Sequence, residues 1–199
     1  MNVNYRDRRA SSLLKVLEPF ETAGGIVSEL FDALLPRNWA TYGGLPFERV
    51  IQQALLAFDF NAQLTNASGD GGVDIILKDQ QGHFAVVQCK CYAESGSIGA
   101  GAVRELIGAK LLAKADSAIL ISTCPLTPQA DVHAKDADVS VLSGTGVNEF
   151  LQLAEKRLHG SAKSSSWPTI SQLTAMLALL NNNQPTRGLA DEPTQPGSP

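Results

Sequence analysis

The sequence has no apolar run near the ~20 residues that a membrane-spanning helix needs, so we expect no membrane contact. Its start, MNVNYRDRRASS, leads into an amphipathic pattern and lacks the continuous apolar stretch of a cleavable signal peptide. Cysteine is scarce, and the odd total of three favours reduced thiols over a disulfide framework. These absences together predict a cytoplasmic protein.

A basic excess is also missing, since the net charge is -4. This argues against nucleic-acid binding through overall basicity, but it leaves room for a local basic groove beside an acidic metal site. The pair Cys89-x-Cys91 has no second Cys or His pair to complete a zinc site, and the histidines are scattered. We therefore interpret both thiols, and that of Cys124, as core residues.

The most informative stretch is 69–91, GDGGVDIILKDQQGHFAVVQCKC. It contains two strand-like runs joined by the polar turn 79–82, which predicts a β-hairpin. Asp74 lies inside the first apolar run, and Gln88 and Lys90 interrupt the second. Burying such groups without partners is costly, so their positions indicate a site.

Strand alternation puts Gln88 and Lys90 on one face of the second strand and Cys89 on the other. Folding the hairpin places Asp74 opposite Val87 or Gln88, and a glycine-assisted bulge decides which. A carboxylate, an amide and an ammonium then meet on one strand pair. Carboxylate and amide oxygens suit Mg²⁺ better than Zn²⁺, and the lysine can orient a water molecule or steady a phosphate.

The combination of GDGGVDI with VQCK resembles the Mrr-like branch of the PD-(D/E)xK nuclease superfamily, in which the second acidic position is often Gln. The motifs LPFERV, VRELIGA and AILIST extend the resemblance from about Gly44 to Leu158. It implies a metal-dependent DNA endonuclease that hydrolyses phosphodiester bonds in restriction or defence against foreign DNA. Whether methylated DNA is the target stays open.

The expected fold is α/β: a restriction-endonuclease-like core with a mixed central sheet flanked by helices, plus short terminal helical additions. We divide the chain into an N-terminal helical arm (1–43), a nuclease core (44–160), and a linker, short helix and disordered tail (161–199). The arm carries a small basic cluster of Arg6, Arg8 and Arg9. The tail helix can pack on the core or bridge two subunits.

Apolar patterning predicts the elements of the core. The helix over 99–115 is expected to bury a stripe of Val103, Leu106, Ile107, Leu111 and Leu112. Strands are expected at 61–65, 73–77, 83–91, 117–123 and 139–142, and helices at 45–58, 99–115, 127–137, 147–158 and 169–180.

The resemblance implies four catalytic residues, Asp74, Gln88, Lys90 and Glu48. It places Mg²⁺, with Mn²⁺ as a substitute, on Asp74, Gln88, the backbone carbonyl of Cys89, and Glu48. Glu48 has a plainer interpretation as a first-turn residue favoured by the helix dipole. Asp70 competes with Asp74 for the metal, but Asp74 lies on the strand, where its position is fixed.

Arg104 and Lys110 are candidate DNA contacts, although charges on a helix are commonly a solvated face. Gly71 and Gly72 can leave room for DNA near the Asp, or form a mobile loop. Expected partners are DNA, a second copy in a homodimer, and a separate recognition subunit. Two alternatives stay open: a structure-directed nuclease of the junction-resolvase type, and a non-catalytic DNA-binding or assembly module with the nuclease fold.

Overall fold

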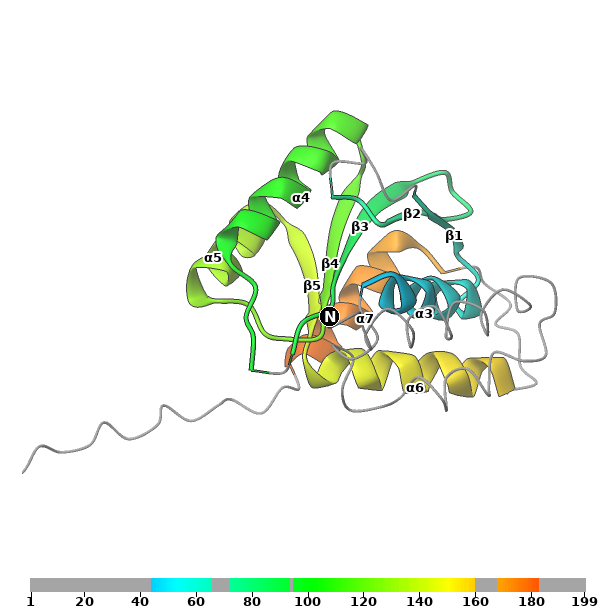
Figure 1. The fold of residues 1–199 in the computed structure, drawn as a ribbon. Coiled ribbons are helices and arrows are strands. Elements are labelled where there is room, and N and C mark those ends of the chain that lie inside the picture. Colours follow the sequence, from blue (N-terminus) through cyan, green and yellow to red (C-terminus); the bar gives the residue numbers. More distant parts are fainter. Residues whose placement is uncertain (1–43, 66–71, 94, 160–167, 183–199) are drawn as a thin grey trace, which may run out of the picture.

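The computed structural model describes residues 44–65, 72–93, 95–159 and 168–182, which form one five-stranded sheet with helices on both faces (Figure 1). This confirms the expected α/β class, and each strand and helix predicted for the core is present with small differences at its ends. The elements are α3 (Gly44–Ala57), β1 (Asn61–Leu64), β2 (Ile75–Lys78), β3 (Phe84–Lys90), α4 (Ala100–Ala113), β4 (Ser117–Ser122), α5 (Pro128–Asp136), β5 (Val139–Ser143), α6 (Thr145–His159) and α7 (Ile170–Asn182).

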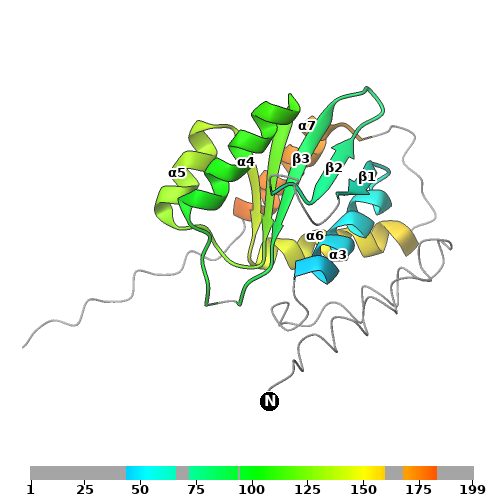
Figure 2. The ribbon, with the colours of Figure 1, turned by 45° about the horizontal axis from the view of Figure 1, so that its top comes forward.

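The strands lie in the sheet in the order in which they occur in the sequence, β1-β2-β3-β4-β5. β1, β2 and β3 are antiparallel, whereas β3, β4 and β5 are parallel and are connected through α4 and α5. The mixed sheet expected from the sequence is therefore confirmed. α4 and α5 cover one face, and α3 and α6 cover the other (Figure 2).

Side chains of β3 alternate between two hydrophobic cores. Ala85, Val87 and Cys89 belong to the core beneath α3, α6 and α7, and Val86 belongs to the core beneath α4 and α5. Because alternate residues of a strand share a face, Gln88 lies on the same side as Val86, toward α4. β3 thus presents polar groups to a buried helix interface.

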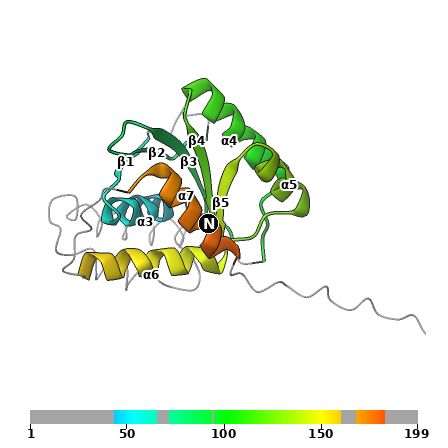
Figure 3. The same cartoon turned by 180° about the vertical axis from the view of Figure 1, so that it is seen from behind.

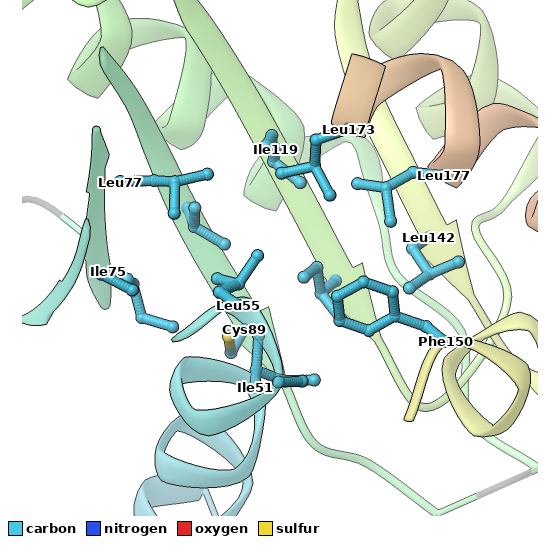
Figure 4. Close-up of a cluster of buried hydrophobic side chains, with 14 of the residues drawn as sticks. Ile51, Leu55, Ile75, Leu77, Cys89, Ile119, Leu142, Phe150, Leu173 and Leu177 are labelled. Carbon is cyan, nitrogen blue, oxygen red and sulfur yellow. The ribbon is translucent and has the colours of Figure 1, made fainter. Parts of the chain in front are cut away.

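Helix α7 packs on β5 and against α6, on the face of the sheet that also carries α3 (Figure 3). Its Leu173 and Leu177 are buried against the same core as Ile119, Leu142 and Phe150 (Figure 4). Of the two roles that the sequence leaves open for this helix, the structure shows packing on the core of its own chain.

The beginning of α7 is tied to the β2–β3 turn by the buried carboxylate of Asp79. Its Oδ1 accepts hydrogen bonds from the amides of Gln81 (2.9 Å) and His83 (3.0 Å). Its Oδ2 accepts one from the amide of Ile170 (3.2 Å) and lies 3.4 Å from Nδ1 of His83. Burial alone would raise the pKa of Asp79, but these hydrogen bonds outweigh it and lower that pKa.

The expected core stripe of α4 is wrong at its C-terminal end. Val103 and Leu106 are buried, but Leu111 and Leu112 are 72% and 88% exposed. Successive helical residues turn by about 100°, which puts these two leucines roughly 120° to 140° away from Leu106 around the helix. The buried stripe continues through the small side chain of Ala109.

Several predictions concern residues outside the described ranges. They are the N-terminal arm with Arg6, Arg8 and Arg9, the candidates Asp70 and Gly71, and most of the linker and tail. Within the described ranges, no helix is both long and apolar enough to cross a membrane.

Candidate active site

Asp74 occupies a β-bulge at the start of β2. Val73 packs in the α4–α5 core and Ile75 in the α3 core, although residues two apart in a regular strand share a face. The amide of Asp74 donates to the carbonyl of Val87 (2.9 Å), and Val87 is also the register partner of Ile75. Asp74 and Ile75 therefore both lie opposite the single residue Val87, which is the arrangement of a β-bulge.

The side chain of Asp74 reaches further along β3 than its backbone does. Its Oδ2 accepts a 2.6 Å hydrogen bond from the amide of Cys89. The carboxylate is thus held against the strand that carries Gln88 and Lys90, as the hairpin prediction required. Charge-assisted bonds of this length fix the direction of a carboxylate.

Gln88 is the fully buried polar residue of β3, with an exposed fraction of 0%. Its Nε2 donates to Oε2 of Glu105 on α4 over 3.3 Å. Its Oε1 is buried too, and it has no hydrogen-bond partner among the described residues. An amide oxygen left without a partner in this way is costly unless a ligand occupies it.

Lys90 ends β3 and is partly buried. Its carbonyl accepts a hydrogen bond from the amide of Thr123 (3.0 Å). The hydroxyl of Thr123 in turn accepts from the amide of Tyr92 (2.8 Å) and donates to the carbonyl of Tyr92 (2.7 Å). Through these hydrogen bonds Thr123, which sequence reasoning missed, holds the backbone of the residues on both sides of Cys91 against the end of β4.

Glu48, in the first turns of α3, is partly buried near the same end of β3. Burial raises the pKa of the Cys89 thiol well above its usual range, the negative charges of Asp74 and Glu48 raise it further, and Lys90 opposes them. The two carboxylates and the ammonium therefore lie near Cys89. A Cβ built on Gly44 would lie 3.5 Å from Oε1 of Glu48, so this carboxylate also turns toward its own helix N-terminus.

The thiols of Cys89 and Cys91 are protonated at neutral pH. Burial, the main cause, raises the pKa of Cys91 to about 11, with smaller effects from Cys124, Thr123 and Glu48. Thiolate, not thiol, is the form that binds metals. Within the described ranges, no three His, Cys, Asp or Glu side chains form a metal-binding group.

Among the candidate DNA contacts, Gly72 lies close to the side chains of Gln88 and Glu105. Its φ is +83°, and a Cβ added there would lie 2.6 Å from Nε2 of Gln88 and 2.8 Å from Cδ and Oε1 of Glu105. Arg104 is exposed on α4 and Lys110 is partly buried in the last turn of that helix. On an α-helix these two residues face different sides.

Glu105 is the main site residue that sequence reasoning missed. It belongs to the motif VRELIGA, where only its neighbour Arg104 was considered. The available signal was that Glu105 lies at the edge of the buried stripe of α4. Its neighbours one helical turn before and after it, Ala102 and Ala109, have small side chains. A buried glutamine on β3 needs a partner, and this position can supply one.

The donor set fits a hard divalent cation. A carboxylate held by a backbone amide and an amide oxygen without a protein partner come from neighbouring strands. Both are ligand types that Mg²⁺ prefers. The observation that tests the fit is the buried Oε1 of Gln88, which a cation would satisfy.

A mixed five-stranded sheet with helices on both faces is the fold of a domain of the restriction-endonuclease type. A family model described as a restriction endonuclease, the Mrr catalytic domain, matches residues 41–151. That is more than half of the 199 residues. The chain therefore belongs to the Mrr-like restriction endonuclease family.

Two solved structures are similar to the chain. The DNA modification-dependent restriction endonuclease AspBHI is 21% identical, with a TM-score of 0.47, over 76% of this chain and 40% of its own. The MspJI restriction endonuclease, solved in complex with a 27-mer oligonucleotide, is 19% identical, with a TM-score of 0.40, over 78% of this chain and 34% of its own. The chain thus spans less than half the length of either protein. A search of curated proteins found no match.

Proposed function

We propose that this chain is a metal-dependent DNA endonuclease that hydrolyses phosphodiester bonds in restriction or defence against foreign DNA. Its family supports the nuclease class. The observation that carries the metal dependence is the fully buried, unpartnered Oε1 of Gln88, the residue before Cys89, whose amide binds the carboxylate of Asp74. Burying an amide oxygen without a hydrogen-bond partner costs free energy, and a cation bound to that oxygen would remove the cost.

The residues that would hold Mg²⁺, or Mn²⁺ in its place, are Asp74, Gln88, Glu48 and the backbone carbonyl of Cys89. When bound, such an ion stabilises negative charge on the scissile phosphate and favours ionisation of the attacking water. The chain prepares this site through two hydrogen bonds. The amide of Cys89 directs Asp74, and Glu105 holds Gln88.

Lys90 is the proposed positioning group for the attacking water. Its backbone is fixed through Thr123, and its charge lies close enough to Cys89 to lower the pKa of that thiol against the dominant burial. The ammonium orients the water and stabilises charge as it develops on the phosphate. The water oxygen loses a proton to solvent and forms a bond to phosphorus while the bond to the 3′-oxygen breaks. The 3′-oxygen takes a proton from solvent, which leaves a 5′-phosphate and a 3′-hydroxyl.

The proposed partners follow from this chemistry. One site of this kind cuts one strand, so cleavage of both strands favours a homodimer or two sequential events. Arg104, exposed on the helix that also carries Glu105, is the proposed phosphate contact on this side. Lys110, Gly71 and a separate recognition subunit stay proposals of the same kind.

The proposal is tested by plasmid nicking and linearisation with Mg²⁺, Mn²⁺ or EDTA, on methylated and unmethylated DNA. Lys90→Ala should lower cleavage by about 100-fold or more, as loss of a charge-stabilising group does. Lys78→Ala removes an exposed lysine at the far end of the same hairpin and should leave cleavage unchanged.

Cleavage that survives in EDTA, or full activity of Lys90→Ala, would contradict the mechanism. Branched DNA belongs in the same assay, because its preferential cleavage would assign the site to a junction-resolvase type of nuclease. A folded protein that binds DNA and cuts none of these substrates would be a non-catalytic module.

A further inference from the structure

The carboxamide of Gln88 has two ends of similar shape and opposite chemistry. Oε1 can bind a cation, whereas the Nε2 donor would repel one. The terminal torsion of a glutamine is broad and roughly two-fold, so the residue itself does not select which end faces the site. Something outside Gln88 must make that choice.

We propose that Glu105 is a positioning residue that fixes the orientation of Gln88 and so keeps Oε1 toward the cation. The inference rests on the proposed function of the site. Its direct support is the hydrogen bond from Nε2 of Gln88 to Oε2 of Glu105 (3.3 Å). A carboxylate accepts and cannot donate, so it binds the NH₂ end and leaves Oε1 on the other side.

Gly72 closes the arrangement from the chain segment that leads to Asp74. Its backbone lies so near the pair that an added Cβ would come within 2.6 Å of Nε2 and 2.8 Å of the Glu105 carboxyl group. The hydrogen bond between Gln88 and Glu105 therefore lies directly against the backbone of this segment. Its position depends on the same stretch of chain that places the metal-binding carboxylate.

Charge explains why an amide on β3 goes with an acid on α4. A carboxylate at position 88 would lie about as near to Glu105 as the amide does, and like charges this close repel each other, the more so because position 88 is fully buried. The amide avoids this repulsion and still offers one oxygen. The effect of a substitution at either position should therefore depend on which residue occupies the other position.

The alternative interpretation is that Glu105 is an ordinary residue of the exposed helix surface, since much of its side chain is exposed. A double-mutant cycle separates the two possibilities. It uses the full chain with Glu105→Ala, Glu105→Gln, Gln88→Glu and the double variant Gln88→Glu/Glu105→Ala. Asp136→Ala removes an exposed carboxylate from α5 and serves as the control for charge alone.

The first measurement is Mn²⁺ binding by calorimetry, with thermal unfolding in EDTA to verify folding. Glu105→Ala should weaken Mn²⁺ binding by about 10- to 100-fold, as loss of a group that orients a metal ligand does. Glu105→Gln can still accept from Nε2 but can also donate to Oε1, so it no longer selects one end of Gln88 and should recover only part of the affinity. In the Gln88→Glu background both oxygens at position 88 are equivalent, so Glu105 has no orientation to fix, and Glu105→Ala should weaken Mn²⁺ binding much less than it does with Gln88 present.

The second measurement is the side-chain ¹H–¹⁵N signal of Gln88 in metal-free protein, assigned by its disappearance in Gln88→Glu. Glu105→Ala should shift this signal and speed its exchange with water, and Asp136→Ala should not. An unmoved signal would overturn the positioning role whether or not the protein cuts DNA. Equal loss of Mn²⁺ affinity in both backgrounds would overturn it as well.

The two proposals fail in different ways. A wild type that binds Mn²⁺ with the expected coupling but cuts no DNA supports the role of Glu105 and contradicts the nuclease. A wild type that binds no Mn²⁺ contradicts the metal site and, with it, the purpose assigned to Glu105.

Discussion

At the scale of single residues, the backbone organises the site as much as the side chains do. The amide of Cys89 holds Asp74, the bulge at Asp74 sets the direction of its carboxylate, and Thr123 fixes the strand on either side of Cys91. The Cys89 thiol itself points into the α3 core and stays protonated. Cys89 therefore contributes to the site through its backbone and not through its thiol.

Asp74→Asn tests the carboxylate. The substituted amide keeps the shape but removes the charge, so metal-dependent cleavage should fall by at least about 100-fold, and Mn²⁺ binding should weaken in calorimetry. The fold should survive, because an amide oxygen can still accept from the Cys89 amide. An Asp74→Asn protein with a normal Mg²⁺ titration would remove Asp74 from the metal site.

Gly72→Ala tests the close approach of backbone to the Gln88–Glu105 pair. We expect a loss of about 1–3 kcal/mol in the free energy of unfolding, measured by urea denaturation, because strain and a clash act together. Gly82→Ala is the matched control: its φ of +87° is similar, but an added Cβ there meets no atom within 4 Å. Equal losses in the two variants would mean that the clash is relieved at no cost.

At the scale of elements, α7 depends on a carboxylate that belongs to the β2–β3 turn. Asp79→Asn replaces the Oδ2 acceptor of the Ile170 amide, or one of the turn acceptors, by a donor. It should reduce the free energy of unfolding at pH 7 by about 1–3 kcal/mol. Thermal or urea unfolding monitored by circular dichroism measures this loss.

The same variant predicts a pH dependence. The folded-state pKa of Asp79 is lowered, so its contribution to stability is complete above its unfolded pKa of about 3.9 and is lost as pH falls through the lower folded value. Asp79→Asn should therefore lose less stability than the wild type between pH 5 and the acid limit. Parallel curves for the two proteins would contradict the assignment.

The sequence predicts elements well and contacts between elements poorly. Apolar periodicity located every described helix and strand, and alternation placed Gln88 and Cys89 on opposite faces of β3. The bulge at Asp74 was left open because a one-residue shift depends on how the sheet packs on both sides. Glu105 was missed because nothing in a sequence pairs a strand residue with a helix residue 17 positions away.

The error at Leu111 and Leu112 has a related cause. Periodicity counts apolar residues, but it does not show where the sheet beneath a helix ends or which small residues extend the contact. The buried stripe continues through Ala109 and not through Leu111 and Leu112, which were expected to continue it. Packing with small side chains leaves little pattern in a sequence.

At the scale of the whole molecule, the folded unit extends beyond the residues that match the family. The match ends at residue 151, inside α6, whereas Leu173 and Leu177 of α7 fill the core over β4 and β5. Leu177→Ala should lower the free energy of unfolding by about 2–5 kcal/mol, as for other buried leucines. Leu179→Ala, on the exposed side of the same helix, is the control.

A chain that ends after residue 168 should lack a cooperative unfolding transition, because it leaves the core over the sheet open. A chain that ends at Asn182 keeps every described element and should unfold cooperatively. Calorimetry of both truncated chains checks this. Cooperative unfolding of the shorter chain would show that α7 is dispensable for the fold.

The position of α7 has a consequence for the growing polypeptide on the ribosome. The last strand ends at Ser143 and α7 ends at Asn182, which is 182 − 143 = 39 residues later. At about 5–20 residues per second, the sheet waits roughly 2 to 8 seconds for the helix that covers it. Until then the turn at Asp79 lacks its contact with Ile170. The hairpin that carries the proposed catalytic groups is thus secured only after α7 has been synthesised.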